Sequence, residues 1–285
     1  MRYEVANTVE EAVDMLGRTE GDVFPLAGGT DLLAQMRSGR VAPQGLVDLK
    51  RIPELREIVV DEEGYRIGAA VSGAELGEHP HLGADWPGVV EATELIGSTQ
   101  IQGRASMGGN LCNASPAADS VPALIAAGAL CSVVGPAGRR ELAVEEVVIG
   151  PGQTCLSPGE IVAHFRLSRP EPRSGDAYLR LIPRSEMDIA VVGVAVALTL
   201  DSEGVCTSCR VALGAVAPTP LGVPEAAAAL VGRPVTGVAL DELAAASSAA
   251  ARPIDDMRGT REYRVHVAGV LARRAAVIAA ERAGS

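Results

Sequence analysis

The first 50 residues alternate helix and strand signals, and this alternation restricts the fold more than any other feature. Asn7 and Thr8 can cap a helix that runs through VEEAVDML, and Gly17 ends it. VFPLA at 23–27 and GLVDL at 45–49 have the apolar character of short buried strands, and LLAQMRSG between them predicts a second helix. Because strands joined through a helix favour a parallel pair, the N-terminal part is expected to be an α/β unit.

The middle of the chain changes to a different pattern. Residues 57–71 alternate like a β-hairpin with Glu62-Glu63-Gly64 at its turn. A helix is predicted over 72–79, and another over 85–97 with Asp85 as its cap and Gly97 as its end. Short strands are predicted near 130–134, 146–149 and 160–167.

The C-terminal part begins after a polar segment, SRPEPRSGD at 168–176, which is the best candidate for a linker. Beyond it, residues 190–200 and 205–216 predict a long β-hairpin. Helices are predicted near 223–231, 240–251 and 260–283. The chain is therefore expected to divide into an α/β part, 1–170, and a sheet-plus-helices part, 175–285.

Composition limits the classes of partner. The chain has 25 basic and 36 acidic residues, a net charge of −11 and only 2% aromatic residues, which argues against nucleic-acid binding. Lys50 is the only lysine. With 47% hydrophobic residues, the core must be built mainly from Ala, Val, Leu and Ile. We find no signal-peptide pattern and no apolar run of about 20 residues, so a cytoplasmic protein without a membrane span is expected.

The sequence LAGGTDLL at 26–33, the first glycine motif, can bind an anion. Gly28 and Gly29 leave a strand and enter a helix, so backbone N–H groups can approach a ligand closely at a helix start. Thr30 adds a hydroxyl donor. The motif matches neither the dinucleotide fingerprint nor the P-loop. The alternative interpretation is a tight strand-to-helix turn in which Thr30 or Asp31 caps the helix.

The sequence RASMGGNLCNASPAADSVPAL at 104–124, the second glycine motif, repeats this arrangement with Gly108 and Gly109. Asn110 and Asp119 could bond a polyol or a ribose. An ordinary long loop is the alternative, and it is less favoured because structureless stretches of this length are usually functional. Two glycine pairs in one α/β domain suggest a diphosphate held from two sides.

Other reactive side chains give weaker signals. Cys206-x-x-Cys209 resembles half a metal or redox site, but on a predicted strand residues i and i+3 point to opposite faces and no second pair completes it. We therefore expect a structural role. The five cysteines do not suggest a disulfide framework, and the four histidines lack metal-site spacing. No metal site and no catalytic acid or base are predicted.

The two glycine motifs resemble those of the FAD-binding medium subunit of molybdenum-containing hydroxylases, the carbon monoxide dehydrogenase and xanthine dehydrogenase family. Four further family-like segments occur in the same order, and together with the two glycine motifs they are spread over most of the chain, from residue 26 to residue 198. The four segments are DLKRIPELREI at 48–58, RIGAAVS at 66–72, ELIGSTQI at 94–101 and YLRLIPRSEMDIAVVGVAVAL at 178–198.

The resemblance implies an α+β fold. Its first part would be a vanillyl-alcohol-oxidase-like (PCMH-type) FAD-binding domain with two α/β subdomains, about 1–55 and 56–170. A domain like the C-terminal domain of the carbon monoxide dehydrogenase flavoprotein, with an antiparallel sheet and helices, would follow at 175–285.

The resemblance also implies roles for individual residues. Two backbone runs would hold the FAD diphosphate and ribityl chain, and Asp119 would bond a sugar or ribityl hydroxyl. Ile96 and Val162 would line the cofactor pocket, and Tyr178 and Arg180 would lie near the isoalloxazine. Some relatives have Lys at the position of Arg180, and the two cations are not interchangeable. The two runs are Ala27, Gly28, Gly29, Thr30, Asp31 and Leu32, and Ser106, Met107, Gly108, Gly109 and Asn110.

The function implied by the resemblance is electron transfer through FAD. Electrons would arrive from [2Fe–2S] clusters in a small partner subunit, after substrate oxidation at a molybdopterin centre in a large one, in a dimer of heterotrimers. They would leave to NAD, a quinone or oxygen. This chain lacks a cysteine-rich insertion, so no cluster is expected in it. The alternatives are a stand-alone FAD-dependent oxidase or dehydrogenase with its own substrate, and a scaffold without cofactor, against which the intact glycines argue.

Overall fold

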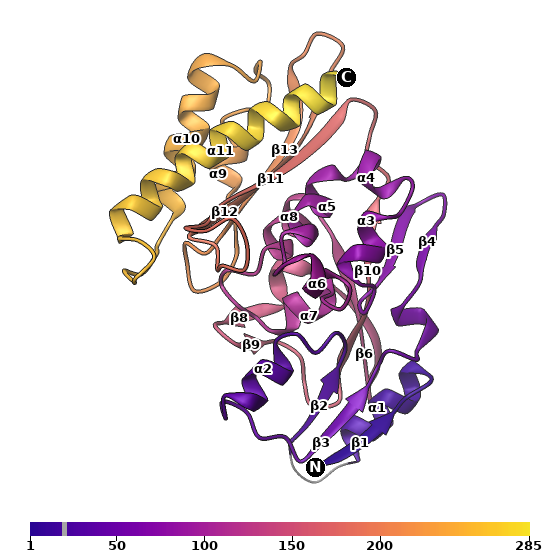
Figure 1. The fold of residues 1–285 in the computed structure, drawn as a ribbon. Coiled ribbons are helices and arrows are strands. Elements are labelled where there is room, and N and C mark those ends of the chain that lie inside the picture. Colours follow the sequence, from indigo (N-terminus) through magenta and orange to yellow (C-terminus); the bar gives the residue numbers. More distant parts are fainter. Residues whose placement is uncertain (19–21) are drawn as a thin grey trace.

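The computed structural model describes residues 1–18 and 22–285, and these form four sheets (Figure 1). The first is a parallel sheet in the order β1-β3-β2, with the helices α1 and α2 between its strands. The predicted parallel pairing of the 23–27 and 45–49 segments is confirmed, whereas the strand at the N-terminus was not expected. The bounds are β1 Arg2–Val5, α1 Val9–Gly17, β2 Val23–Leu26, α2 Leu32–Arg37 and β3 Gly45–Asp48.

The second sheet is antiparallel, in the order β4-β5-β10-β6-β7. It contains the predicted hairpin, and β7, which was not expected, forms its edge. Its strands are β4 Ile58–Val60, β5 Gly64–Gly68, β6 Leu130–Gly135, β7 Gly138–Ala143 and β10 Ile161–Ser168, and β8 Val148–Gly150 and β9 Gln153–Thr154 form a separate two-stranded sheet. Short 3₁₀ helices span Pro53–Leu55 and Val144–Glu146.

Six helices connect β5 to β6 along the chain, and the local sequence explains where the first of them begins. Ser72 and Glu75 form a reciprocal capping box at α3. The sequence predicted Asp85 as the cap of the next long helix, and this prediction is wrong. Asp85 ends α4 and accepts a hydrogen bond from the Tyr65 hydroxyl at 2.6 Å, so Trp86 precedes the helix. The helices are α3 Gly73–Gly77, α4 Leu82–Asp85, α5 Pro87–Glu94, α6 Thr99–Gln102, α7 Met107–Cys112 and α8 Ser120–Ala126.

The C-terminal sheet is antiparallel in the order β11-β12-β13-β14 and includes the predicted long hairpin. The helices α9, α10 and α11 lie on one side of this sheet (Figure 1). The bounds are β11 Ser174–Leu181, β12 Val192–Leu200, β13 Cys206–Gly214, β14 Leu221–Gly222, α9 Pro224–Ala228, α10 Gly237–Ala250 and α11 Arg261–Gly284.

A stripe of alanines brings α11 unusually close to this sheet. A Cβ built on Gly175 of β11 would lie 2.2 Å from the Ala279 carbonyl oxygen, so the helix backbone touches the strand backbone. Small residues on both sides allow this contact, in keeping with a core that contains few rings. The fully buried alanines of the stripe are Ala268, Ala272, Ala275, Ala276 and Ala279.

A clamp of polar contacts joins the C-terminal sheet to helix α5 of the central part. The carboxylate of Asp176, in β11, accepts from the Gly88 amide at 3.0 Å and the Val89 amide at 3.2 Å, at the start of α5. Arg282 of α11 pairs with Glu91 and donates to the Asp176 carbonyl at 2.7 Å. Burial raises the pKa of Asp176 to about 7. This clamp fixes α5, β11 and α11 relative to one another.

The two cysteines of Cys206-x-x-Cys209 do not point to opposite faces, contrary to the sequence prediction. The register of β12 and β13 shifts between Thr199 and Leu200: Thr199 is opposite Ser208, and Leu200 is opposite Cys206. The extra residue is Thr207, which makes a β-bulge. Cys206 is therefore in register with Leu200 and Cys209 with Leu198, and both thiols pack with the same apolar cluster.

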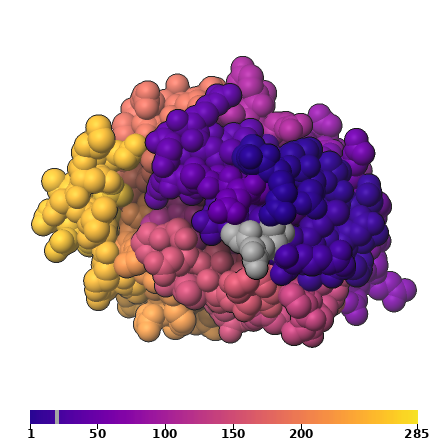
Figure 2. Space-filling view, turned by 90° about the horizontal axis from the view of Figure 1, so that it is seen from below, coloured from indigo at the N-terminus to yellow at the C-terminus, as the bar shows by residue number. Residues whose placement is uncertain are grey.

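Figure 2 shows the molecule from below, with the N-terminal residues (indigo) covering the upper right of this face. On this face α11 stands at the side, away from the N-terminal residues. The N-terminal unit and α11 thus lie on different sides of the central part of the molecule.

Candidate functional site

The two glycine motifs are in direct contact. A Cβ built on Gly28 would lie only 1.8 Å from the carbonyl oxygen of Arg104, so the first motif presses against the backbone that begins the second. A second link joins the helices that follow: the Gln35 side chain of α2 donates to the Asn113 side chain at 2.8 Å. Glycine at position 28 is required by this close approach. Chain segments 76 residues apart therefore form one surface.

The first glycine motif turns directly into α2. Gly29 has φ +79°, a left-handed conformation that favours glycine, and its carbonyl accepts from the Leu33 amide at 3.0 Å. Asp31 occupies the N-cap position, but its side chain caps none of the described amides. Thr30 is half-buried. The motif is a tight strand-to-helix turn, as the alternative interpretation expected, but the side chain of Asp31 at the N-cap position makes no capping hydrogen bond.

The second glycine motif is a short helix, α7, rather than a plain loop. Ser106 caps it by accepting from the Gly109 amide at 3.2 Å, and Met107 is buried in the core. The two glycines differ. A Cβ on Gly108 would lie 2.4 Å from the Ala69 carbonyl oxygen, so Gly108 serves packing. On Gly109 the nearest described atom would be Ser106 Oγ at 3.4 Å, so this position has open space before it.

The second glycine motif continues into α8 through a pair of contacts. The Asn110 side-chain oxygen accepts from the Ser120 amide at 3.2 Å and from its hydroxyl at 2.8 Å. The preceding residue, Asp119, is 8% exposed and accepts from the Tyr178 hydroxyl and from Arg180 Nη1, each at 2.8 Å. The structure thus brings together Asp119, Tyr178 and Arg180, which the resemblance assigned separately to the cofactor site.

Burial sets the electrostatics of this triad. It raises the pKa of Asp119 to about 6, and the neighbouring Arg180 guanidinium opposes the shift. It also raises the pKa of Tyr178 well above its usual range, so the phenol stays neutral. The Arg180 side chain is only 5% exposed. Its Nε is buried and has no hydrogen-bond partner among the residues that the structure describes.

A hollow of about 630 Å³ opens beside the triad. Tyr178, Leu179 and Arg180 of β11 form one wall, and residues of α11 and of the α5–α6 segment form the others. Ile96 lies in that segment, between the lining residues Leu95 and Gly97, whereas Val162 is buried in the core with Met107. The other lining residues are Glu91, Glu94, Ser98, Thr99, Gln102, Ser185, Glu186, Ile278 and Arg282.

A smaller, basic hollow adjoins the first glycine motif. Gly28 lines it together with Lys50, Arg56 and Arg104, and Lys50 pairs with Asp48 at 2.7 Å. We did not single out these cations from the sequence. The sequence did contain a signal for Lys50. This residue follows the carboxyl end of β3, and Gly28 follows the carboxyl end of the neighbouring parallel strand β2. Ligands often bind at the carboxyl ends of parallel strands.

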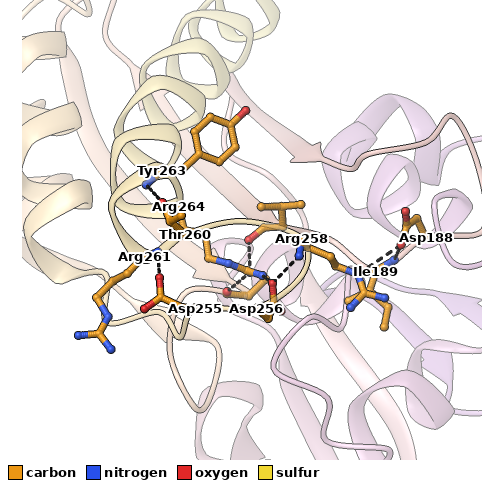
Figure 3. A network of polar contacts seen from close by, with 11 residues as sticks. Asp188, Ile189, Asp255, Asp256, Arg258, Thr260, Arg261, Tyr263 and Arg264 are labelled. Atoms are coloured by element: carbon orange, nitrogen blue, oxygen red, sulfur yellow. Dashed lines mark hydrogen bonds and ion pairs between the residues drawn. The ribbon is translucent and has the colours of Figure 1, made fainter.

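The connection after β11 is anchored by a polar network (Figure 3). Arg264, at the start of α11, is buried and donates to the Val191 carbonyl at 2.7 Å and to Asp256 at 2.6 Å. Arg258 pairs with Asp188 at 3.4 Å. This network holds the β11–β12 connection, and with it the wall of the larger hollow that β11 carries.

These residues fit FAD chemically. The open position at Gly109 and the cations Lys50 and Arg104 beside Gly28 suit an anionic diphosphate, and the buried Arg180 Nε needs an acceptor that the described chain does not supply. The larger hollow has the size that small-molecule sites require.

Within residues 1–18 and 22–285, no group of three His, Cys, Asp or Glu side chains could hold a metal ion. None of the described helices has the length and apolarity to cross a membrane.

Comparison with known proteins identifies the class. The family described as "FAD binding domain in molybdopterin dehydrogenase" matches residues 1–170, and the family described as "CO dehydrogenase flavoprotein C-terminal domain" matches 177–278. The chain therefore belongs to the family of FAD-binding medium subunits of molybdenum hydroxylases, and it is a FAD-dependent oxidoreductase subunit.

Individual relatives agree along the whole length. The carbon monoxide dehydrogenase medium chain of Afipia carboxidovorans is 35% identical over 286 residues, covering 99% of this chain and 97% of that protein. The xanthine dehydrogenase FAD-binding subunit of Escherichia coli O157:H7 is 29% identical over 284 residues, covering 99% and 97%. A reconstituted carbon monoxide dehydrogenase from Oligotropha carboxidovorans superposes with a TM-score of 0.95 at 34% identity, covering 99% and 98%. The predicted fold class and family are confirmed.

Proposed function

We propose that this chain carries electrons through FAD between a partner's iron–sulfur clusters and an external acceptor. A large molybdopterin subunit and a small [2Fe–2S] subunit would complete a dimer of heterotrimers, in the cytoplasm. Bound FAD supplies the redox chemistry, because it can take up and release electrons singly or in pairs. The medium-chain relatives support such an assembly. NAD, a quinone or oxygen would serve as acceptor.

One observation carries this proposal: the direct contact of the two glycine motifs, continued into the Asp119–Tyr178–Arg180 triad beside the larger hollow. We infer that Ala27 to Leu32 and Ser106 to Asn110 hold the diphosphate and ribityl chain, with Lys50 and Arg104 adding positive charge. Arg180 would offer its Nε to an acceptor atom of the cofactor. Tyr178 would lie at the flavin ring, and Ile96 and Val162 would complete the pocket.

Asp119 has a role in this proposal that extends the sequence interpretation. Its two oxygens accept from Tyr178 and Arg180, so it positions both side chains. A further bond to a sugar or ribityl hydroxyl would use the remaining lone pairs of the carboxylate. We also propose that the chain divides near residues 170–176 into a FAD-binding domain, with subdomains about 1–55 and 56–170, and a C-terminal domain from 175.

Replacing Gly109 with Leu tests the site. Position 109 has room for a side chain only in the space assigned to the cofactor, so we expect a folded protein that loses FAD on desalting. Gly83→Leu is the matched control. Gly83 also lies in a helix, is exposed, and has no described atom within 4 Å of a built Cβ. The measurement is flavin absorbance per chain after reconstitution.

The outcomes separate the parts of the proposal. Unchanged FAD retention in Gly109→Leu would show that the site is elsewhere. Retained FAD that small substrates reduce without partner subunits would favour a stand-alone dehydrogenase over an electron-transfer subunit. Co-purification of a large molybdopterin chain and a small iron–sulfur chain would support the assembly.

A further inference from the structure

The helix α2, which begins in the first glycine motif, is not held by a core. None of its residues is buried, and Leu33 is 44% exposed. The other helix of the N-terminal unit, α1, buries Val9, Ala12 and Val13 in an apolar cluster that includes residues of β6 and β10. Apolar packing therefore fixes α1 on the molecule, but it does not fix α2.

One polar contact takes the place of that packing. The Gln35 side chain donates to the Asn113 side-chain oxygen at 2.8 Å, and the contact is partly buried. Among the hydrogen bonds and ion pairs of residues 1–18 and 22–285, no other joins the segment 29–40 to a different part of the chain. Without this bond, α2 would be held mainly by the chain at its two ends.

Asn113 is a firmly held partner for this bond. Its amide donates to the Gly109 carbonyl at 2.9 Å at the end of α7, and α7 is anchored in the core by Met107 and Leu111. The same short helix therefore places Asn113 and presents Gly109 to the space assigned to FAD.

The first glycine motif and α2 form one piece. The Gly29 carbonyl accepts from the Leu33 amide at 3.0 Å, and just before it Gly28 rests against the Arg104 carbonyl oxygen. Two contacts thus orient this piece: a pivot at Gly28 and a tether at Gln35. If the tether is lost, α2 can turn about the pivot, and the backbone amides at its start turn with it.

We propose that Gln35 and Asn113 are positioning residues for FAD. Their hydrogen bond holds the amides of the first glycine motif at the separation from the second motif that the diphosphate requires, before the cofactor arrives. Neither side chain has to touch FAD. Such preorganisation raises affinity because the site need not be ordered on binding. This inference rests on the proposed function, in which the two motifs hold the diphosphate.

Changing the lengths of the two side chains tests the tether. Gln35→Asn shortens one side by a methylene group, and adding Asn113→Gln restores the total length. We expect Gln35→Asn to bind FAD about fivefold more weakly, the factor of one ordinary hydrogen bond, and the double variant to bind within about twofold of the unsubstituted protein. Flavin fluorescence during titration of the full-length apoprotein measures the affinities.

Gln44→Asn is the matched control. Gln44 lies in the same N-terminal unit and is exposed, and its side chain makes no hydrogen bond to any residue that the structure describes. The same chemical change at this position should leave FAD affinity unchanged. Because α2 has no buried residue, Gln35→Asn should also keep the unfolding midpoint of the apoprotein.

A second measurement does not require FAD. Trypsin cleaves after arginine, and Arg37 and Arg40 are exposed at the end of α2 and just beyond it. In the apoprotein, Gln35→Asn should be cleaved at these two sites about fivefold faster, because proteolysis follows the population in which α2 is open. The double variant and Gln44→Asn should be cleaved at the rate of the unsubstituted protein.

The outcomes are distinct. Equal FAD affinity in Gln35→Asn and the unsubstituted protein, or a double variant as weak as Gln35→Asn, would overturn the inference while FAD binding itself stands. A lower unfolding midpoint in Gln35→Asn would show a general structural role and would also overturn it. An unsubstituted protein that binds no FAD would overturn the proposed function, and this inference with it.

Discussion

At the scale of residues, Asp119 connects two regions of the chain. It accepts from Tyr178 and Arg180, which follow it by 59 and 61 residues. From sequence, its place in a polar, glycine-rich run indicated a hydroxyl-binding residue. Its two partners could not be predicted, because nothing local relates the end of the second glycine motif to a strand beyond the linker. The resemblance placed all three residues near the cofactor, and only the folded chain shows that they bond one another.

Replacing Asp119 with Asn tests this triad. The substitution keeps the shape but leaves the Arg180 charge buried without a counterion, so the free energy of unfolding of the apoprotein should fall by about 3 kcal/mol. Denaturant unfolding measures it. Arg180→Met in the Asp119→Asn background removes the unpaired charge, and the double variant should lose less than the sum of the two single variants. Strict additivity would mean that the pair is not coupled.

At the scale of elements, the contact between the two glycine motifs depends on one missing methyl group. Gly28 follows β2 and contacts the backbone of Arg104, and both residues line the smaller hollow. The parallel pairing of β2 with β3 could be predicted from alternating strand and helix signals. The contact with α6–α7 could not, because it depends on how two sheets pack.

Gly28→Ala should separate the two motifs. The new methyl group would overlap the Arg104 carbonyl oxygen, so we expect about 2 kcal/mol lower unfolding free energy and at least about tenfold weaker FAD binding. Flavin fluorescence during titration reports the affinity. Gly103→Ala is the control, since it lines the same hollow and a Cβ there meets no described atom within 4 Å. Equal affinities for the two variants would contradict this account.

Other elements show which features a sequence pattern can predict and which it cannot. The hairpin of β12 and β13 was predictable because two largely apolar segments flank the turn-forming residues 201–204, whereas β7, GRRELA, is mostly exposed and gives no such pattern. The Thr207 bulge was invisible for a different reason: a bulge is a relation between two strands, so it appears only in the register with β12. This is why the two cysteines were assigned to opposite faces.

At the scale of the whole molecule, one carboxylate clamps two parts together. Asp176 belongs to the C-terminal sheet, yet it satisfies the first amides of α5 in the FAD-binding part. Burial in this contact raises its pKa to about 7, while the two amide hydrogen bonds and Arg282 oppose the shift. The clamp therefore holds the wall that carries Tyr178 and Arg180 in place.

The pH dependence of stability follows from this shift. Because the folded-state pKa of Asp176 lies above the unfolded value, the folded protein holds the proton more tightly. Its contribution is fully present below about pH 4 and is lost as pH rises through about 7, amounting to roughly 4 kcal/mol. Unfolding free energies measured from pH 4 to 8 should fall less steeply in Asp176→Asn. Identical slopes would exclude Asp176 as the titrating group.

The seam between α11 and β11 restricts how the chain can change during evolution. The Ala279 backbone touches Gly175, and the other helix residues at this contact are fully buried alanines. No space is therefore left for a larger side chain between α11 and β11. A larger side chain on either side cannot be absorbed by a rotamer change, so it forces the helix outward and moves Arg282 away from Glu91 and Asp176. Positions 175 and 279 are therefore expected to remain small in every lineage that keeps this clamp, and to covary where it is lost.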